Sequence, residues 1–338
     1  MGETVAGQQS HFDPGPSVLA GETADVYFLR GQAILEKEGL DPVATMEAFP
    51  SGHGILCGIK EALGLLRRVL GPEAQVWAME EGEPFSAKEV VLRITGRYNS
   101  FGLYETAILG MLAHSSGWAT AARECVEAAQ GVPVISFGAR HVHPRVADIM
   151  DYAAVVGGCI TASTTAGARL AGLAPSGTMP HALILVFGDT VKAATAFDRY
   201  MPPDVPRIVL VDTFKDEVEE SLRVAEALGA RLQGVRLDTP SERGRVTPHL
   251  VKEVRAHLDL AGHSHVKIVV SGGVTPDRIR LFREEGAPVD AYGVGSHISG
   301  ARPIDFTADL KEVGGRPVAK RGRLPGITPN PRLKKIQP

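Results

Sequence analysis

The stretch that decides the fold is residues 207–238, RIVLVDTFKDEVEESLRVAEALGARLQGVRLD. Its first run, Arg207–Asp212, is apolar and rich in β-branched residues until it ends at an aspartate. Asp216–Leu228 then carries apolar residues at helical spacing, and Leu232–Leu237 returns to the pattern of a strand. A strand, a helix and a second strand in this order predict one βα unit of a parallel sheet.

The same alternation of strand-like and helix-like segments begins at about Gly131. Residues Ala182–Phe187 (ALILVF) fit a buried strand by composition, but Thr178 can cap a helix and Pro180 suits its first turn, so we expect a helix that continues to Tyr200. About seven parallel strands predict a closed or nearly closed α/β barrel. The other expected strands are Val132–Phe137, Ala153–Val156, Leu173–Ser176, Val266–Ser271 and Val289–Val294, with a further helix over Thr275–Glu285.

The chain before Gly131 has a different pattern, in which helices and strands do not alternate regularly. We expect a separate α+β region there. The tail from Lys320, KRGRLPGITPNPRLKKIQP, is basic and contains prolines, and we expect a solvated terminus. The expected elements of the first region are helices over Ala33–Lys37, Gly58–Leu70 and Tyr104–Ala128 and strands over Gln75–Met79 and Glu89–Ile94.

Composition narrows the class of protein. With 338 residues, 44% apolar and 22% charged, the chain can bury a full core, and its length fits one large domain and a smaller one. A net charge of -3 argues against a general nucleic-acid surface. Only Cys57, Cys125 and Cys159 are present, too few for a disulfide framework or a four-thiolate zinc site, so we expect a cytoplasmic protein. The polar stretch Met1–Ser17 and the lack of a long apolar segment predict neither export nor membrane insertion.

Glycine-rich turns follow two of the expected strands. In parallel barrels the active site lies at the carboxyl ends of the strands. The turns Ser271-Gly272-Gly273 and Gly293-Val294-Gly295-Ser296 each precede an expected helix and offer backbone N–H groups to a phosphate. A single glycine turn is more often needed for steric reasons, but two of them on the last two strands favour a phosphate site.

Two aspartates, Asp212 and Asp238, end apolar strands. A carboxylate at the mouth of a barrel must be paired, solvated or bound to a metal. Each could instead cap a helix, Asp212 before Thr213 and Asp238 before Thr239. Two carboxylates beside a phosphate site suit a ribose diol and the magnesium of a pyrophosphate, which is the interpretation we prefer.

His181 and Arg140 are further candidates, and each has an ordinary structural explanation. A histidine near a helix start, such as His181, is usually only a satisfied polar residue. Arg140 could be a surface cation, or it could grip a carboxylate with both arms of its guanidinium.

An ordered set of motifs resembles the nicotinate phosphoribosyltransferases over roughly Gly21–Arg323, and the set is far more specific than any single motif. The resemblance implies an incomplete parallel α/β barrel over residues 131–299 and an N-terminal α+β domain over residues 1–130, completed by about 300–338. It also implies a homodimer or larger homo-oligomer with shared active sites. The motifs are Glu22–Phe28, Phe101–Gly110, Gly177–His181, Leu210–Thr213, Val235–Asp238, Ser271–Gly273 and Tyr292–Gly295.

The resemblance also implies roles for single residues. Phe137 and the partner subunit's Tyr27 would sandwich a pyridine ring, and Arg140 would hold its carboxylate. His181 matches a histidine that relatives phosphorylate with ATP, so ATP is an expected co-substrate and Mg²⁺ an expected cofactor. Asp212 and Asp238 would face the phosphoribosyl group and its magnesium. The remaining expected contacts to the phosphoribosyl group and its phosphates are Thr178, Arg236, Ser271, Gly272, Gly273, Gly293, Gly295 and Ser296.

One position bears on the choice between an acid and an amide substrate. Amide-using relatives carry an aspartate in the segment that matches Thr161–Gly167, where this chain has Ser163. A carboxylate there would repel nicotinate, whereas a hydroxyl can donate to it. We therefore expect nicotinate and phosphoribosyl pyrophosphate as substrates, and nicotinate mononucleotide and pyrophosphate as products.

Three other functions fit part of the sequence. Quinolinate phosphoribosyltransferase, a decarboxylating enzyme on the same fold, would need extra basic residues for a second carboxylate and has no use for the Thr178–His181 motif. A phosphate-binding barrel isomerase or lyase would leave the Tyr27 region and the large N-terminal part unexplained. A catalytically silent paralogue is a third alternative, against which Asp212, Asp238 and His181 argue.

Overall fold

The computed structural model describes residues 12–336, which belong to two compact units. The first unit comprises Met1–Ala121, Leu170–Gly172 and Ala301–Pro338, and the second comprises Ala122–Arg169 and Leu173–Gly300. Residues 1–11 and 337–338, and with them most of the polar stretch Met1–Ser17, lie outside the described residues. Among residues 12–336, no helix combines the length and the apolar character needed to cross a membrane.

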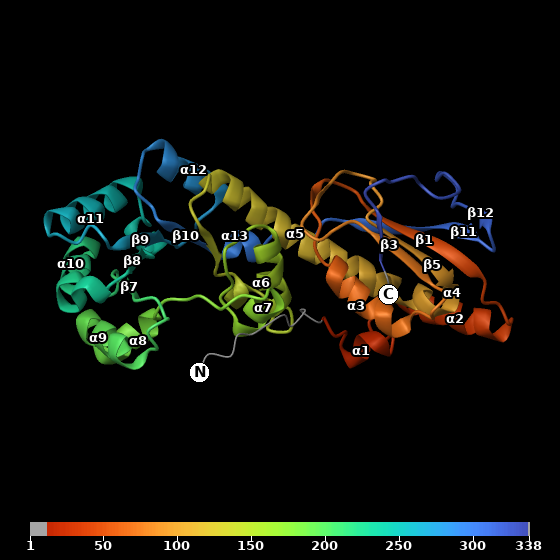
Figure 1. Cartoon of the computed structure of the whole chain (residues 1–338), viewed down its shortest axis with the longest axis horizontal. Helices are drawn as coiled ribbons and strands as arrows, with labels where there is room; N and C mark the ends of the chain where they lie inside the picture. Colours follow the sequence, from red (N-terminus) through yellow and green to blue (C-terminus); the bar gives the residue numbers. More distant parts are fainter. Residues whose placement is uncertain (1–11, 337–338) are drawn as a thin grey trace. The chain divides into compact units, whose positions relative to one another are not determined.

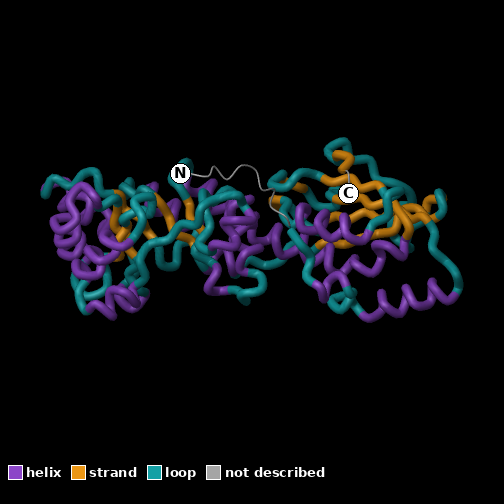
Figure 2. Tube along the Cα trace, turned by 60° about the horizontal axis from the view of Figure 1, so that its bottom comes forward, coloured by secondary structure: helices purple, strands orange, loops and turns teal. Residues whose placement is uncertain are grey.

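The first unit is built on an antiparallel sheet of order β12-β11-β1-β5-β3-β13, with helices on one of its faces (Figure 2). Strand β1 (Val43–Pro50) pairs with β5 (Leu92–Arg97) and with β11 (Phe306–Val313), so both ends of the chain share one sheet. The other elements are α1 (Pro16–Leu19), α2 (Val26–Lys37), β2 (Gly54–Ile55), α3 (Ile59–Val69), β3 (Gln75–Ala78), β4 (Pro84–Phe85), α4 (Tyr98–Phe101), η1 (Gly102–Tyr104), β12 (Arg316–Pro317), β13 (Lys334–Ile336) and α5 (Glu105–Ala129), which continues into the second unit from Ala122.

Strand β1 is buried on both faces of the sheet. Met46 and Ala48 belong to the hydrophobic core that also contains Leu66 of α3 and Leu112 of α5. Because successive side chains of a strand alternate, Glu47 points to the opposite face. There it is 1% exposed and accepts hydrogen bonds from Nε of Arg93 at 2.8 Å and from the backbone N–H of Thr328 at 3.1 Å.

The basic tail is part of this unit, and the prediction of a solvated terminus is wrong. Lys334–Ile336 forms β13, which pairs with β3. Nη1 of Arg332 lies 2.8 Å from Oε1 of Glu89, and the side-chain amide of Asn330 donates to the backbone carbonyl of Val90 at 2.8 Å. The basic residues of the tail suggested a solvated segment, but Arg332 pairs with the carboxylate of Glu89 in the first unit.

The second unit contains a five-stranded parallel sheet of order β6-β10-β9-β8-β7, with α9–α12 outside it (Figure 1). Together with the α+β part, it confirms the predicted fold class of an incomplete parallel α/β barrel. The elements are β6 (Val134–Ser136), η2 (Ala139–His141), α6 (Ala147–Val156), α7 (Thr165–Leu170), α8 (His181–Phe187), α9 (Thr190–Tyr200), β7 (Ile208–Leu210), α10 (Glu217–Leu228), η3 (Gly229–Arg231), β8 (Gly234–Leu237), η4 (Ser241–Arg243), α11 (Pro248–Leu260), β9 (Lys267–Val270), α12 (Pro276–Glu284), β10 (Ala291–Val294) and α13 (Ser296–Ser299).

Two of the expected strands of this unit do not form. Residues Ala153–Val156 are the last turn of α6, because a short apolar run fits a buried helix as well as a strand and the alanines favour the helix. Leu173–Ser176 is not a strand either, since Pro175 lacks the N–H that a ladder needs and the segment has no neighbouring strand. His181 therefore does not follow a third strand.

The helix expected up to Tyr200 is two helices. It is interrupted at Gly188, whose φ of 70° is left-handed, and Asp189 then caps α9 by accepting from the N–H of Lys192 at 2.9 Å. The first of the two helices, α8, begins at His181 after Pro180, so the predicted cap by Thr178 is wrong. Because α8 begins only at His181, the hydroxyl of Thr178 is available for a different contact.

Candidate active site at the carboxyl ends of the strands

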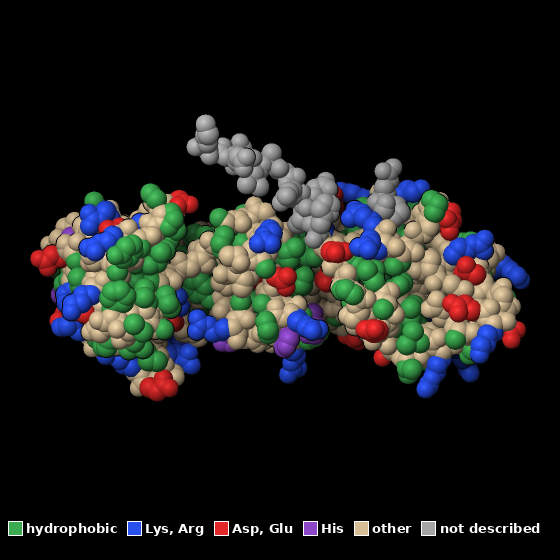
Figure 3. Space-filling model, turned by 90° about the horizontal axis from the view of Figure 1, so that it is seen from below, with side chains coloured by type: hydrophobic (Ala, Val, Ile, Leu, Met, Phe, Trp, Pro, Cys, Tyr) green, Lys and Arg blue, Asp and Glu red, His purple; other side chains and the backbone are tan. Residues whose placement is uncertain are grey.

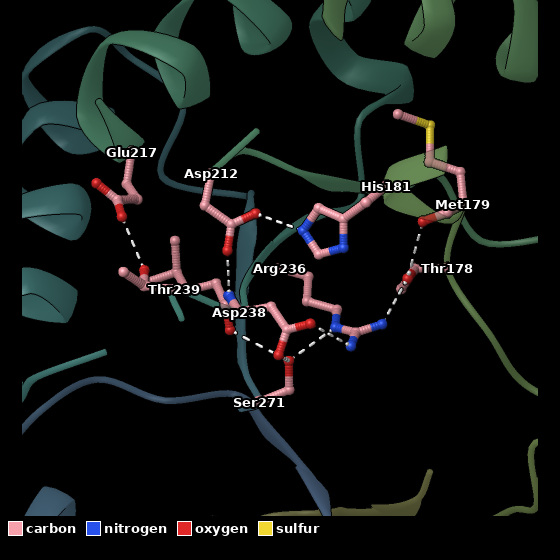
Figure 4. A network of polar contacts seen from close by, with 10 residues as sticks. Thr178, Met179, His181, Asp212, Glu217, Arg236, Asp238, Thr239 and Ser271 are labelled. Carbon is pink, nitrogen blue, oxygen red and sulfur yellow. Dashed lines mark hydrogen bonds and ion pairs between the residues drawn. The ribbon is translucent and has the colours of Figure 1, made fainter. Parts of the chain in front are cut away.

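A histidine and two aspartates meet beyond β7 and β8 (Figure 4). Nε2 of His181 lies 2.9 Å from Oδ1 of Asp212, and the backbone N–H of Asp238 donates to Oδ2 of the same carboxylate at 2.6 Å. The Asp212 side chain is 1% exposed and that of His181 is 38% exposed. Because an ionised carboxylate only accepts hydrogen bonds, His181 turns its Nε2–H to Asp212 and leaves Nδ1 available. Neither Asp212 nor Asp238 caps a helix, which was the alternative explanation for both. The residue that caps α10 is Asp216, and the residue before η4 is Pro240.

Arg236 joins three other predicted site residues in one network (Figure 4). Its Nη2 donates to Oδ2 of Asp238 at 3.0 Å, its Nε to the hydroxyl of Ser271 at 2.8 Å, and its Nη1 to the hydroxyl of Thr178 at 3.0 Å. Ser271 in turn donates to Oδ1 of Asp238 at 2.9 Å. Burial lowers the pKa of Arg236, the charges of Asp238 and Asp212 oppose that shift, and the charge of Arg140 adds to it. An arginine stays charged under such a shift, so the network carries a fixed cation.

Arg140 and Phe137 lie beside this network. The guanidinium of Arg236 sits 4.6 Å from the centroid of the Phe137 ring, and the charge of Arg140 acts on Arg236. The Phe137 ring also explains why position 293 is a glycine, because a Cβ there would collide with the ring. The charges of Arg140, Asp212 and Asp238 all act on Arg236, so these three predicted site residues lie in the same part of the second unit.

The two glycine turns differ in structure. Gly272 and Gly273 have φ of 85° and 67°, and a Cβ at Gly272 would lie 3.0 Å from Oδ1 of Asp238. This turn thus needs glycine for its backbone and touches the carboxylate network. Gly295 is instead packed against the carbonyl oxygen of Phe137, and the adjoining helix α13 has four residues, of which the first, Ser296, is exposed.

A buried acid lies beneath Ser163, and sequence reasoning missed it. Asp151 on α6 is fully buried and accepts from the hydroxyls of Ser136 at 2.8 Å, Ser163 at 3.2 Å and Thr164 at 2.8 Å, as well as from the N–H of Thr164 at 2.8 Å. The hydroxyl proton of Ser163 is directed at Asp151 rather than at a ligand. The sequence did contain a signal for this buried acid, because Asp151 stands among the apolar residues of α6.

Tyr27 lies in the first unit, and the expected contact of the partner subunit's Tyr27 with a pyridine ring stays a prediction. Tyr27 is on α2, is 60% exposed, and its hydroxyl donates to Oδ2 of Asp25 at 3.3 Å. Its ring lines an apolar groove with Ile34, Leu35 and Leu103.

Two more basic residues lie near the strand ends, His141 next to Arg140 in the chain and Arg245 after β8. Nε2 of His141 would lie 3.6 Å from a Cβ at Gly295, and the guanidinium of Arg245 lies against Gly273. A phosphate or a second carboxylate would meet more positive charge here than Arg140 alone supplies.

Comparisons with known proteins identify related chains. The model of the quinolinate phosphoribosyl transferase N-terminal domain matches residues 25–116, and that of the C-terminal domain matches residues 118–309. A crystal structure of nicotinate-nucleotide pyrophosphorylase from Pyrococcus furiosus is 44% identical in sequence and superposes with a TM-score of 0.85, covering 97% of this chain and 82% of that one.

Curated relatives are more distant. Nicotinate phosphoribosyltransferase pncB1 of Mycobacterium tuberculosis is 30% identical, covering 95% of this chain and 79% of its own length. A chain of Archaeoglobus fulgidus named "Probable nicotinate-nucleotide pyrophosphorylase [carboxylating]" is 27% identical, covering 79% of this chain and 95% of its own length.

These matches contradict the predicted family, function and enzyme class. Both family models are those of quinolinate phosphoribosyl transferase, and the solved structure that is 44% identical carries the name of a nicotinate-nucleotide pyrophosphorylase. The prediction of an ATP-coupled nicotinate phosphoribosyltransferase is therefore wrong, and phosphorylation of His181 loses its support. The quinolinate alternative was placed behind for want of extra basic residues, but His141 follows Arg140 directly in the chain, and Arg245 is brought to the Gly273 turn by folding.

Proposed function

We propose, from the premise that this chain belongs to the quinolinate phosphoribosyl transferase family, that it makes nicotinate mononucleotide from quinolinate and phosphoribosyl pyrophosphate. Pyrophosphate and CO₂ are the other products. The observation that carries the proposal is the match of both family models in order, the second of which spans the cluster of His181, Asp212 and Arg236. A pyrophosphorylase, the name of the solved relative, is the same chemistry written in the opposite direction.

We assign the carboxylate network to the sugar donor. As pyrophosphate leaves, positive charge grows at the anomeric carbon, and fixed carboxylates nearby stabilise it without having to reorient. Asp212 and Asp238 fit this role because protein donors hold both of them in place. Arg236, with the hydroxyl of Thr178 beside it, would bind the leaving pyrophosphate, and Gly272 and Gly273 would take the 5′-phosphate.

We assign the acceptor to the region beside Phe137. Quinolinate carries two carboxylates, so its site needs more positive charge than a site for nicotinate. Arg140, whose charge acts on Arg236, supplies positive charge, and His141 beside Gly295 offers a ring N–H to the second carboxylate. The ring of Phe137 gives a flat surface on which a pyridine can stack.

The reaction then needs no covalent intermediate with the protein. The lone pair of the pyridine nitrogen forms the bond to the anomeric carbon, and the bond to pyrophosphate breaks with its electron pair on the leaving oxygen. The cationic ring nitrogen next stabilises the electron pair left on C2 when its carboxylate departs as CO₂. A proton from water replaces the carboxylate. The protein contributes alignment and electrostatic stabilisation.

Magnesium is an expected companion of the pyrophosphate, but the residues do not form a protein-held magnesium site. Both oxygens of Asp212 and both of Asp238 already accept hydrogen bonds or pair with Arg236. Residues 12–336 contain no group of three or more histidine, cysteine, aspartate or glutamate side chains arranged to hold a metal. Any Mg²⁺ would arrive with the pyrophosphate and water.

We further propose that the enzyme acts as a homo-oligomer in the cytoplasm. The groove beside Tyr27 is apolar, and α2 exposes Val26, Tyr27 and Ile34 by more than half. Hydrophobic side chains also gather over α8 and α9, where Val186 is 84% and Tyr200 70% exposed (Figure 3). Apolar surface of this kind supports association of copies of the chain. The three buried, free cysteines support a reducing compartment.

A substrate panel tests the proposed function. The full chain is incubated with phosphoribosyl pyrophosphate, Mg²⁺ and either quinolinate, nicotinate or nicotinamide, and nicotinate mononucleotide and pyrophosphate are measured. We expect turnover of quinolinate, with CO₂ released from labelled C2-carboxylate in equal amount to the nucleotide. Turnover of nicotinate without turnover of quinolinate would overturn the proposal. Arg140→Gln should raise the KM for quinolinate more than the KM for the sugar donor.

A further inference from the structure

Asp151 joins two segments of the chain through one buried carboxylate. It lies on α6 and is fully buried, and its Oδ1 accepts from the hydroxyl of Ser136 at 2.8 Å. Its Oδ2 accepts from the backbone N–H and the hydroxyl of Thr164, both at 2.8 Å, and from the hydroxyl of Ser163 at the longer distance of 3.2 Å. One oxygen therefore holds the end of β6, and the other holds the residues that precede α7.

Helix α7 packs tightly on this acid. A Cβ at Gly167 would lie 2.5 Å from Cβ of Asp151, so the helix begins in direct contact with it. The four donors to the carboxylate are all uncharged. Burying an ionised group without a cation is costly, and apolar side chains of the same shape would fill the space at lower cost. The positions that Asp151 fixes explain its presence better than stability does.

The first of the two segments leads to Phe137, the residue after Ser136. The backbone N–H of Phe137 donates to the carbonyl of Val294 at 2.7 Å, and the guanidinium of Arg236 lies 4.6 Å from the centroid of its ring. Because successive side chains of a strand point to opposite faces, Ser136 is directed at α6 and Phe137 at the other face of the sheet. The bond from Ser136 to Asp151 thus fixes the backbone from which the ring projects.

The second segment leads to the same arginine. The N–H of Ser176 donates to the carbonyl of Ala162 at 3.0 Å, which fastens the loop before Thr178 to the segment that Asp151 holds. The hydroxyl of Thr178 then accepts from Nη1 of Arg236 at 3.0 Å (Figure 4). Both segments that Asp151 ties together therefore end at Arg236.

We propose that Asp151 is a positioning residue, which sets the spacing between the ring of Phe137, on which the pyridine stacks, and Arg236, which binds the leaving pyrophosphate. This inference rests on the proposed function for the roles of Phe137 and Arg236. Asp151 is fully buried and reaches no substrate itself. The pyridine nitrogen and the pyrophosphate lie on opposite sides of the anomeric carbon during the transfer, so the spacing of their binding groups decides the alignment of the attack.

Steady-state kinetics of the full chain, with one partner of Asp151 removed at a time, test this inference. Ser136→Ala removes the hydroxyl at Oδ1, and Thr164→Val removes the hydroxyl at Oδ2 while the shape of the side chain is kept. We expect each to lower kcat roughly tenfold to hundredfold, because a misplacement of about 1 Å has an effect of this size. The KM for phosphoribosyl pyrophosphate should stay within about threefold. Thr164→Ser keeps the hydroxyl and should recover most of the lost kcat.

Ser116→Ala is the matched control. Ser116 is as buried as Ser136, and its hydroxyl donates to the carbonyl of Cys57 at 3.1 Å in the first unit. Ser116→Ala and Ser136→Ala should lower the unfolding temperature by a similar amount, about 2–4 °C, but only Ser136→Ala should lower kcat. An equal effect of the two variants on kcat, or no recovery in Thr164→Ser, would overturn the inference.

The same kinetics separate this inference from the proposed function. The assay uses quinolinate, or nicotinate if the substrate panel selects it. A chain that turns over neither acid contradicts the proposed function. An active chain whose kcat is unchanged by Ser136→Ala and Thr164→Val contradicts only the role of Asp151.

Discussion

Nε2 of His181 lies 2.9 Å from Oδ1 of Asp212, although the two residues are 31 positions apart in the chain. His181 opens α8, and Asp212 follows β7. The carboxylate is nearly inaccessible, while the imidazole is partly exposed. A buried acid therefore sets the orientation of a ring that solvent and ligands can reach.

Asp212→Asn should keep the fold and reduce activity. The asparagine oxygen can still accept from the N–H of Asp238, but its amide group must donate to Nε2 of His181, which forces the other tautomer of the ring. We expect kcat/KM to fall roughly hundredfold or more, with the unfolding temperature within about 4 °C of the unaltered chain. Nitrogen NMR of His181 reports the tautomer, and Asp204→Asn in an exposed loop is the control. Activity within about threefold of normal would show that the carboxylate charge is not used.

Ser163→Ala should affect stability rather than substrate binding. The hydroxyl proton points to Asp151, so its removal costs about 1 kcal/mol of folding free energy. The KM for the pyridine substrate should change by less than about threefold, because no contact to it is lost. Asp151→Asn should destabilise the chain more, by about 1–3 kcal/mol, since an amide group would face donors. A large rise of KM in Ser163→Ala would restore the sequence interpretation of this residue.

Glu105→Gln should stabilise the first unit at high pH. Burial, with the charges of Asp309 and Asp25, raises the pKa of Glu105 to about 7 from its ordinary value of 4.5. Between these values the folded chain binds a proton that the unfolded chain has lost, so stability falls as the pH rises and the penalty is complete above the higher value.

The gain in Glu105→Gln should be on the order of 1–2 kcal/mol at about pH 8, reduced by partial exposure to solvent, and absent at about pH 4. Thermal unfolding at the two pH values measures it, with Glu226→Gln on the exposed side of α10 as the control. An identical gain at both pH values would point to a cause other than ionisation.

Removing the tail from Ile327 onward should destabilise the first unit. Glu47 would lose the N–H of Thr328, Glu89 would lose Arg332, and β3 would lose its partner β13. We expect a loss of about 2–4 kcal/mol, visible as a lower unfolding temperature and faster proteolysis of the sheet. Arg321→Ala, an exposed tail residue, should have little effect. Unchanged stability after truncation would mean that these contacts contribute nothing.

Sequence patterns predicted the βα units best where strand and helix periods alternate clearly. The runs that became β7, β8, β9 and β10 were found, as were α10 and α12 between them but not α11, and Asp212, Asp238 and Ser271 followed as strand-end residues. Local signals failed for short apolar runs, as at Ala153–Val156, because period and composition do not separate a buried helix from a strand there.

By itself, the sequence determined the alternation of strands and helices, and with it the edge at which Asp212, Asp238 and the glycines gather, because side-chain periodicity and turn residues are local properties. Only the tertiary structure decided the partners. It placed Asp151 under Ser163, Arg245 over Gly273 and the basic tail on Glu47. These contacts join residues far apart in the chain, so the free energy that selects them depends on the whole packed fold rather than on any one segment.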